Sequence, residues 1–229
     1  MRNSRSRRRS AAICGIVGPA VFTTGWIVAG LVQRDYDATR EDISGLAAPT
    51  ASHPWIMIVG LAVAGVLTAI FGIGLHEGIA RGSRVGPALV AFAGIGLAGL
   101  GVLRNDCSSM TVECKARVAA GDVSWHHMAH DVLSAPVFAA AILAPLVLAL
   151  RFAREPQWRR LAQLSVATAP VLIALFVLGG VEAIPSWTGA FQRAAATVAS
   201  VWMAVVAIRL LWVSRAAASR SLDTGASVC

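Results

Sequence analysis

The chain has 229 residues, of which 56% are hydrophobic and only 14% are charged, and its mean hydropathy is +0.67. A soluble domain carries about 25% charged residues, so this composition excludes an ordinary soluble globule and indicates a membrane protein. The net charge of +8 would suit a nucleic acid. The basic residues, however, stand in short segments beside apolar runs and not on one folded face, which predicts no nucleic-acid partner.

Six apolar runs are long enough to cross a bilayer, which takes about 20 residues of helix. They cover residues 11–32, 55–75, 85–103, 132–150, 161–181 and 191–213. An open sheet would leave backbone groups unpaired in lipid, so the sequence predicts an all-α integral membrane bundle of six transmembrane helices in one domain, 11–213. Residues 1–10 form a predicted basic cytoplasmic tail, and residues 214–229 a flexible cytoplasmic tail.

The first run resembles a signal peptide in following a cluster of arginines. It is longer than the roughly 7–15 apolar residues of a cleavable signal, and no cleavage site of small residues closes it. We therefore interpret it as an uncleaved first span.

The orientation follows from the Lys and Arg residues, which gather in cytoplasmic segments. Most of them fall at the N-terminus, in the turns after the second and fourth spans, and at the C-terminal end. This bias predicts that both termini are cytoplasmic and that the protein lies in the cell (cytoplasmic) membrane as a multi-pass protein.

The predicted spans hold few ionisable groups. Arg209 is the exception, and we expect it to reach the inner headgroups. Ion-coupled carriers usually keep ionisable groups at mid-membrane, which disfavours a carrier of that kind. The Gly94 to Gly99 segment fits GxGxxG, but it lies in an apolar span without a preceding strand, so we expect it to allow close helix packing and not to bind a dinucleotide.

Polar residues gather in the predicted outer loops, at 33–54 and 104–131. We expect them to form a cap that contacts a ligand. The candidates for this contact are Asp35, Tyr36, Asp37, Ser44, Asp106 and, at the outer end of the fifth span, Glu182.

Cys107 and Cys114 lie in one predicted outer loop. Cysteine pairs outside the cytoplasm are usually oxidised, so we predict a disulfide between them. The alternatives are two free thiols or two thiolate metal ligands.

A histidine-rich segment precedes the fourth span, and it allows three interpretations. If the helix begins near Ser124, His126 and His130 share a face, as do His127 and Asp131. The segment could bind zinc or another divalent metal through His126, His127, His130, Asp106 and Asp131. It could perform acid–base catalysis with His127, His130, Asp131 and Ser134. It could also lie at the headgroup level without chemistry, either as a polar helix cap, which we favour, or as a contact for a substrate or lipid headgroup.

The chain resembles the bacterial membrane family called domain of unknown function 998, common in actinobacteria. The resemblance covers roughly residues 13 to 213, and its matching pieces are Gly18-Pro19, Asp35-Tyr36-Asp37, Ile43-Ser44-Gly45-Leu46, Trp55, Asp106-Cys107 to Cys114, and His130-Asp131. The family often has Gly before the Tyr and Pro after Asp37, where this chain has Asp35 and Ala38. The resemblance implies a six-span bundle in which the first loop and the histidine segment lie together, and it implies no activity.

Three functions remain open at this point. We favour a non-enzymatic membrane protein whose His/Asp-rich extracytoplasmic cap binds a lipid, a small apolar ligand or a partner, with no cofactor. The first alternative is a metal-dependent membrane hydrolase acting at the outer leaflet, with one zinc or other divalent metal that activates water. The second is a small-molecule permease or exporter.

Overall fold

The computed structural model describes residues 2–79, 82–180 and 184–226. Six long helices carry the fold: α1 (Arg2–Val32), α2 (Pro54–Gly78), α3 (Val85–Val102), α5 (Trp125–Phe152), α6 (Arg159–Gly180) and α7 (Thr188–Ala226). A short helix, α4 (Val112–Ala119), and three 3₁₀ turns, η1 (Ser44–Ala47), η2 (Pro156–Trp158) and η3 (Pro185–Trp187), lie in the connections. The described residues contain no strand, so the predicted all-α class is confirmed.

Each long helix contains a segment long and apolar enough to cross a membrane. These segments are Ser6–Val32, Pro54–Gly78, Val85–Val102, Trp125–Phe152, Pro156–Gly180 and Thr188–Arg215. The protein is therefore a multi-pass membrane protein with six spans, as the sequence predicts.

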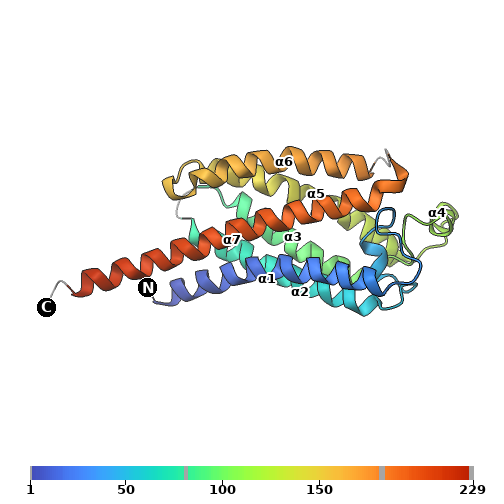
Figure 1. Ribbon diagram of the computed structural model, residues 1–229, viewed down its shortest axis with the longest axis horizontal. Coiled ribbons are helices and arrows are strands. Elements are labelled where there is room, and N and C mark those ends of the chain that lie inside the picture. The colour runs from blue at the N-terminus through green and yellow to red at the C-terminus, as the bar shows by residue number, and fades with distance from the viewer. Residues whose placement is uncertain (1, 80–81, 181–183, 227–229) are drawn as a thin grey trace.

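The six spans form a closed ring. Each long helix packs against the next one along the chain, and α7 packs against α1, so that the last span meets the first. Figure 1 shows α1 and α7 side by side, with both chain ends at one end of the bundle and α4 at the other. The ring surrounds an interior to which all six long helices contribute side chains.

Close contact between α2 and α3 depends on glycine. A β-carbon on Gly65 or Gly72 of α2 would collide with the α3 backbone, and one on Gly94 of α3 would collide with the α2 backbone. The absence of side chains lets the two backbones touch, which is the usual basis of helix association in lipid. The packing role predicted for the glycine-rich segment of α3 is confirmed.

The end of the bundle that carries the chain termini is tightly packed. The rings of Phe152 and Trp158 stack there with centroids 5.2 Å apart, and both side chains are fully buried. The guanidinium of Arg151 donates to the carbonyl oxygens of Ser83 (3.0 Å), His76 (3.3 Å) and Ile79. The ring is thus closed at this end by apolar packing and by one buried arginine.

The helices extend beyond the predicted spans. α5 begins at Trp125 and not at 132, because the polar histidine segment is helical and projects past the apolar run. α1 begins at Arg2, and α7 continues to Ala226, so both predicted tails contain helix. The flexibility expected for 214–229 stays a prediction.

Candidate functional site: a polar cap over an apolar cavity

The polar residues meet at the end of the bundle opposite the chain termini. The cap comprises two connecting segments, 33–53 between α1 and α2 and 103–124 between α3 and α5, together with the first turns of α5 and α7. Side chains that join these parts include Asp42, His127, His130, Gln192 and Arg193.

Asp42 joins the two connecting segments. Its Oδ1 accepts a hydrogen bond from the Ser108 hydroxyl (3.0 Å), and its Oδ2 accepts one from the Gly45 amide (3.1 Å). Burial raises the pKa of this carboxyl, while the bond from Ser108 and the nearby His130 act in the opposite direction. A β-carbon on Gly45 would lie only 2.7 Å from the Ser108 β-carbon, so glycine is needed for this approach.

His130 fixes η1 to α5. The buried ring donates from Nδ1 to the Leu103 carbonyl oxygen (2.5 Å), and its Nε2 lies 3.1 Å from the Ser44 hydroxyl. A carbonyl can only accept, so Nδ1 is the donor of the bond to Leu103. Both ring nitrogens therefore hold the cap in place. The contact between Ser44 and His130 also agrees with the family resemblance, which implies that the first loop and the histidine segment lie together.

His127 fixes the second connecting segment to α5. Its buried Nδ1 accepts a hydrogen bond from the Asp106 amide (3.1 Å), and its Nε2 lies 3.7 Å from Asp131 Oδ2. The Asp106 carboxylate accepts from the amide and hydroxyl of Ser124 (2.6 and 2.7 Å). Burial opposes ionisation of Asp106, but the bonds from Ser124 and the His127 and Arg117 charges together keep its pKa below the usual value.

The remaining histidine-segment candidates point elsewhere. His126 is exposed, with its ring against Trp125 at a centroid distance of 4.0 Å and its Nδ1 3.3 Å from the Ser124 hydroxyl. The Ser134 hydroxyl donates to the His130 carbonyl oxygen of the preceding turn (2.8 Å). The structure therefore places His126 and Ser134 away from the two buried histidine rings.

Arg193, on the first turns of α7, is a buried cation clamped by the first connecting segment. Its guanidinium donates to the carbonyl oxygens of Glu41 (2.7 Å) and Gly189 (3.0 Å) and to the Tyr36 hydroxyl. It also lies over the rings of Trp26 and Tyr36, at 5.7 and 5.4 Å from their centroids. This arrangement joins α1, the cap and α7, and so fixes the seam that closes the ring.

Tyr36 belongs to the same cluster, and its hydroxyl also donates to the Asp42 carbonyl oxygen (3.0 Å). Burial raises the pKa of this phenol, and the Arg193 charge acts in the opposite direction. The preceding residue, Asp35, adopts a left-handed φ of 53°, a conformation that favours glycine.

Asp37 caps a single turn. Its Oδ1 accepts from the amide and the hydroxyl of Thr39 (2.9 and 2.6 Å), which lowers the pKa of this exposed carboxyl. The Asp37 amide in turn donates to Glu41 Oε1 (3.2 Å). Asp37 thus has a structural role in the loop, and the predicted ligand contact at Glu182 lies outside the described residues.

Metal donors converge at one place among the described side chains. Cys107, Cys114 and His127 are buried, and one potential ligand atom from each lies within 4.8 Å of the others. The two cysteines form the predicted disulfide, with their Cα atoms 5.7 Å apart. Because the thiolate is the metal ligand, this trio could bind a metal only after reduction, and the structure does not bring His126, His130, Asp106 or Asp131 into it.

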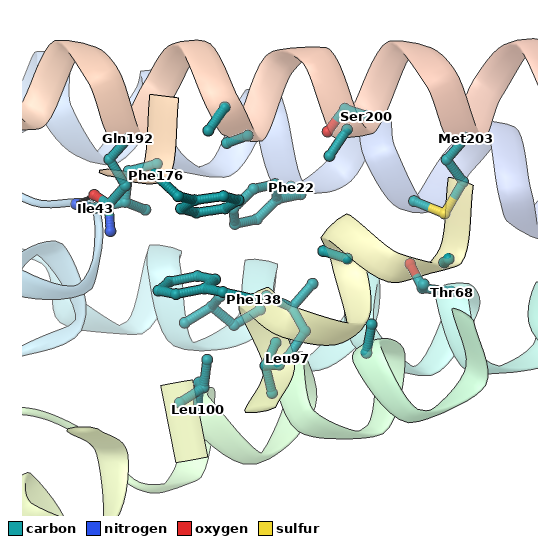
Figure 2. A pocket seen from close by; sticks show the side chains of 18 of the residues that line it. Phe22, Ile43, Thr68, Leu97, Leu100, Phe138, Phe176, Gln192, Ser200 and Met203 are labelled. Atoms are coloured by element: carbon teal, nitrogen blue, oxygen red, sulfur yellow. Dashed lines mark hydrogen bonds between the residues drawn. The ribbon is translucent and has the colours of Figure 1, made fainter. Parts of the chain in front are cut away.

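An apolar cavity lies inside the ring, directly beneath the cap. Its volume is about 160 Å³, and Figure 2 shows the rings of Phe22, Phe138 and Phe176 around its middle. All six spans contribute to its wall, and Ile43 and Ser44 of the cap close one end together with His130 and Gln192. No Asp, Glu, Lys or Arg is among the residues that line it in the described part of the chain. The cavity can therefore hold an uncharged, mainly apolar group.

A second, polar hollow lies on the other side of η1. It has a volume of about 260 Å³, and its lining includes Asp35 and Tyr36 of the first segment and the disulfide and Arg117 of the second. Gly45 and Leu46 line this hollow, whereas Ile43 and Ser44 line the apolar cavity. One turn of the cap thus separates a polar space from an apolar one.

Comparison with known families gives one match. The model of the family described as "Protein of unknown function (DUF998)" matches residues 16–209. The chain belongs to the DUF998 family. No curated protein matches the chain, and no solved structure does.

The region shared with DUF998 contains every residue that lines the apolar cavity, from Phe22 to Met203. It also contains four residues that the sequence did not single out: Asp42, Ser108, Gln192 and Arg193. The available signal was the position of Gln192 and Arg193 at the start of the apolar run 191–213, where a polar pair needs partners.

Proposed function

We propose that this protein binds an uncharged, apolar ligand inside its ring of helices, beneath the cap. The cavity carries this proposal, because its wall is apolar, is built from all six spans and ends at the polar groups of the cap. Binding pockets for small molecules are mostly apolar spaces of this kind, with a few placed polar groups.

The cavity is large enough to enclose part of a ligand. An engineered cavity of about 150 Å³ with apolar walls stays dry and binds benzene, and the present volume is about 160 Å³. A ring system or a section of an alkyl chain would fill it. A charged group would not suit it, because His130 is the only titratable side chain among the described residues of the wall, and both of its ring nitrogens are already bonded.

We further propose that the cap faces the outside of the cytoplasmic membrane. Arg-rich segments gather at the opposite end, and a disulfide in the cap suits an oxidising compartment. A ligand would then lie within the outer half of the bilayer, with its polar part toward Gln192 and Ser44.

The test is to identify what purifies with the protein. The full chain is purified in a mild detergent, the bound molecules are extracted, and mass spectrometry compares the wild type with two variants of α5. Ala141→Phe fills the cavity, which Ala141 lines, and should remove the bound molecule. Ala139→Phe adds the same ring at an exposed position of the same helix and should leave it in place. Equal content in the two variants would contradict cavity binding.

The hydrolase alternative has less support, because His127 and His130 are both used to hold the cap together. It makes a separate prediction. Protein purified without chelators would contain about one zinc or similar ion per chain, as structural and catalytic sites do, and His127→Ala would lose it. A metal-free, folded protein would remove this alternative. The permease alternative requires a polar path through the ring, whereas the space inside it has an apolar wall.

A further inference from the structure

Three polar side chains that line the apolar cavity have unused hydrogen-bonding groups. They are Gln192 at the cap end and Thr68 and Ser200 deeper in the ring. Figure 2 shows Gln192 beside Ile43 at one end of the cavity, and Thr68 and Ser200 near Met203 at the other. A polar group inside a lipid-embedded bundle is costly when it has no partner, so these positions call for a reason.

The Gln192 amide has a defined orientation. Its Oε1 accepts a hydrogen bond from the Ile43 backbone amide at 2.7 Å, and only the oxygen of a carboxamide can accept. The other terminal group of the Gln192 side chain is therefore the NH₂ group, and no described residue accepts a hydrogen bond from it. Since Gln192 lines the cavity, it offers donors to an occupant.

Thr68 and Ser200 differ from four other hydroxyls in the spans. These four donate to the carbonyl of the preceding turn at 2.7–2.8 Å: Ser134, Thr168, Thr197 and Ser214. Thr68 and Ser200 make no such bond among the described residues, although both are helical and line the cavity. Thr23 and Thr24 of α1 also lack one, but they do not line the cavity.

The two polar ends are separated by an apolar middle. Gln192 and Ser200 lie eight positions apart on α7, which corresponds to about 12 Å along the helix at 1.5 Å per residue. The phenylalanine rings of Figure 2 lie between the two ends and offer no hydrogen bond. The cavity is thus polar at both ends and apolar between them.

We propose that the ligand carries two uncharged oxygen groups about 12 Å apart, joined by an apolar chain or ring system. The oxygen at the cap end is an acceptor for the Gln192 amide, and the deeper oxygen bonds to Thr68 or Ser200. This inference rests on the proposed function and adds the chemical class of the ligand to it. The absence of Asp, Glu, Lys and Arg from the described wall selects alcohol, ketone or ester oxygens over carboxylate or amine.

The experiment uses three probes of one chain length: octane, its terminal alcohol and its terminal diol, whose extended chain has a length similar to the separation of the two polar ends. Binding to the full chain in one detergent is followed by the fluorescence of Trp202, which lines the cavity. In the wild type the diol should bind roughly 2- to 10-fold more tightly than the alcohol, as expected for one additional neutral hydrogen bond. The ratio of the two affinities is measured in the same way in the variants, and the wild-type ratio is compared with theirs.

Two variants remove one polar end each. The double variant Thr68→Val, Ser200→Ala removes the deeper hydroxyls, and Gln192→Met removes the amide. Each should abolish the advantage of the diol over the alcohol, and octane binding by the same variant reports that the cavity is intact. Thr197→Val is the control on α7, because Thr197 is exposed and does not line the cavity, and it should keep the wild-type ratio.

The outcomes separate the two proposals. Octane binding with no loss of the diol's advantage in the variants would overturn the two-oxygen inference and leave apolar binding in the cavity standing. Failure of all three probes to bind, together with no effect of Ala141→Phe on co-purified molecules, would overturn the proposed function itself.

Discussion

Replacing Arg193 with methionine should destabilise the protein by about 3 kcal/mol. Methionine keeps an unbranched, apolar side chain but loses the bonds to the Glu41 carbonyl and the Tyr36 hydroxyl. A hydrogen bond to a charged group contributes about 1.5–3 kcal/mol, so these two bonds give about 3–6 kcal/mol. The Gly189 carbonyl adds little, because it lies at a position where the helix itself supplies a donor. The lower end of the range applies, since the variant no longer bears the cost of burying a guanidinium.

Reversible unfolding in mixed detergent–SDS solutions, followed by tryptophan fluorescence, measures this loss. Arg117→Ala is the matched control, because Arg117 makes an exposed ion pair with Asp122 at 3.3 Å, and such pairs contribute about 1 kcal/mol or less. Arg193→Lys keeps the charge without the planar fork and should fall between the two. If Arg193→Met proves no less stable than Arg117→Ala, the clamp between α7 and the cap does not stabilise the fold.

Three further predictions follow from the cap. The raised pKa of the Asp42 carboxyl means that the folded state binds the proton more tightly than the unfolded state. Stability should therefore fall as pH rises through that pKa. Asp42→Asn should flatten the curve measured by thermal unfolding, because its amide does not titrate, and its oxygen can accept from the Gly45 amide while its NH₂ group donates to the Ser108 hydroxyl. Asp35→Gly should fold at least as well as the wild type, because the left-handed φ of 53° suits glycine, whereas Asp35→Val should lower the melting temperature. Replacing Cys107 and Cys114 together with serine should cost about 2.5 kcal/mol for a loop of this length, a loss that reductant should reproduce in the wild type and not in the variant.

The fold was largely predictable because six long apolar runs leave few alternatives to a helical bundle. The parts of the fold that the sequence did not predict are helical segments made of polar residues. Thr111 is the N-cap of α4, because its hydroxyl accepts a hydrogen bond from the Cys114 amide. Hydropathy does not predict α4, because this short helix is not an apolar run. The predicted fourth span began only at residue 132, since a hydropathy window detects the lipid-facing part of a helix and not its polar ends. The start near Ser124 that the histidine interpretations assumed is the one that α5 has.

The site was predictable only in part. The disulfide and the meeting of the first loop with the histidine segment followed from spacing and resemblance. The partners of the buried charges did not, because Arg193 contacts Glu41, which lies far away along the chain. The cavity could not be predicted at all, since it exists only when six helices close into a ring and a few small side chains, such as Ala141 and Ala199, leave space at its centre.

Closure of the ring between α1 and α7 also determines the order in which the protein can be assembled. The ribosome delivers α7 last, so the first five spans must wait in the bilayer as an open arc. During that interval the Arg193 clamp has not yet formed. Insertion of α7 closes the ring and completes the wall of the cavity in one step. A chain stopped before α7 therefore lacks the cavity.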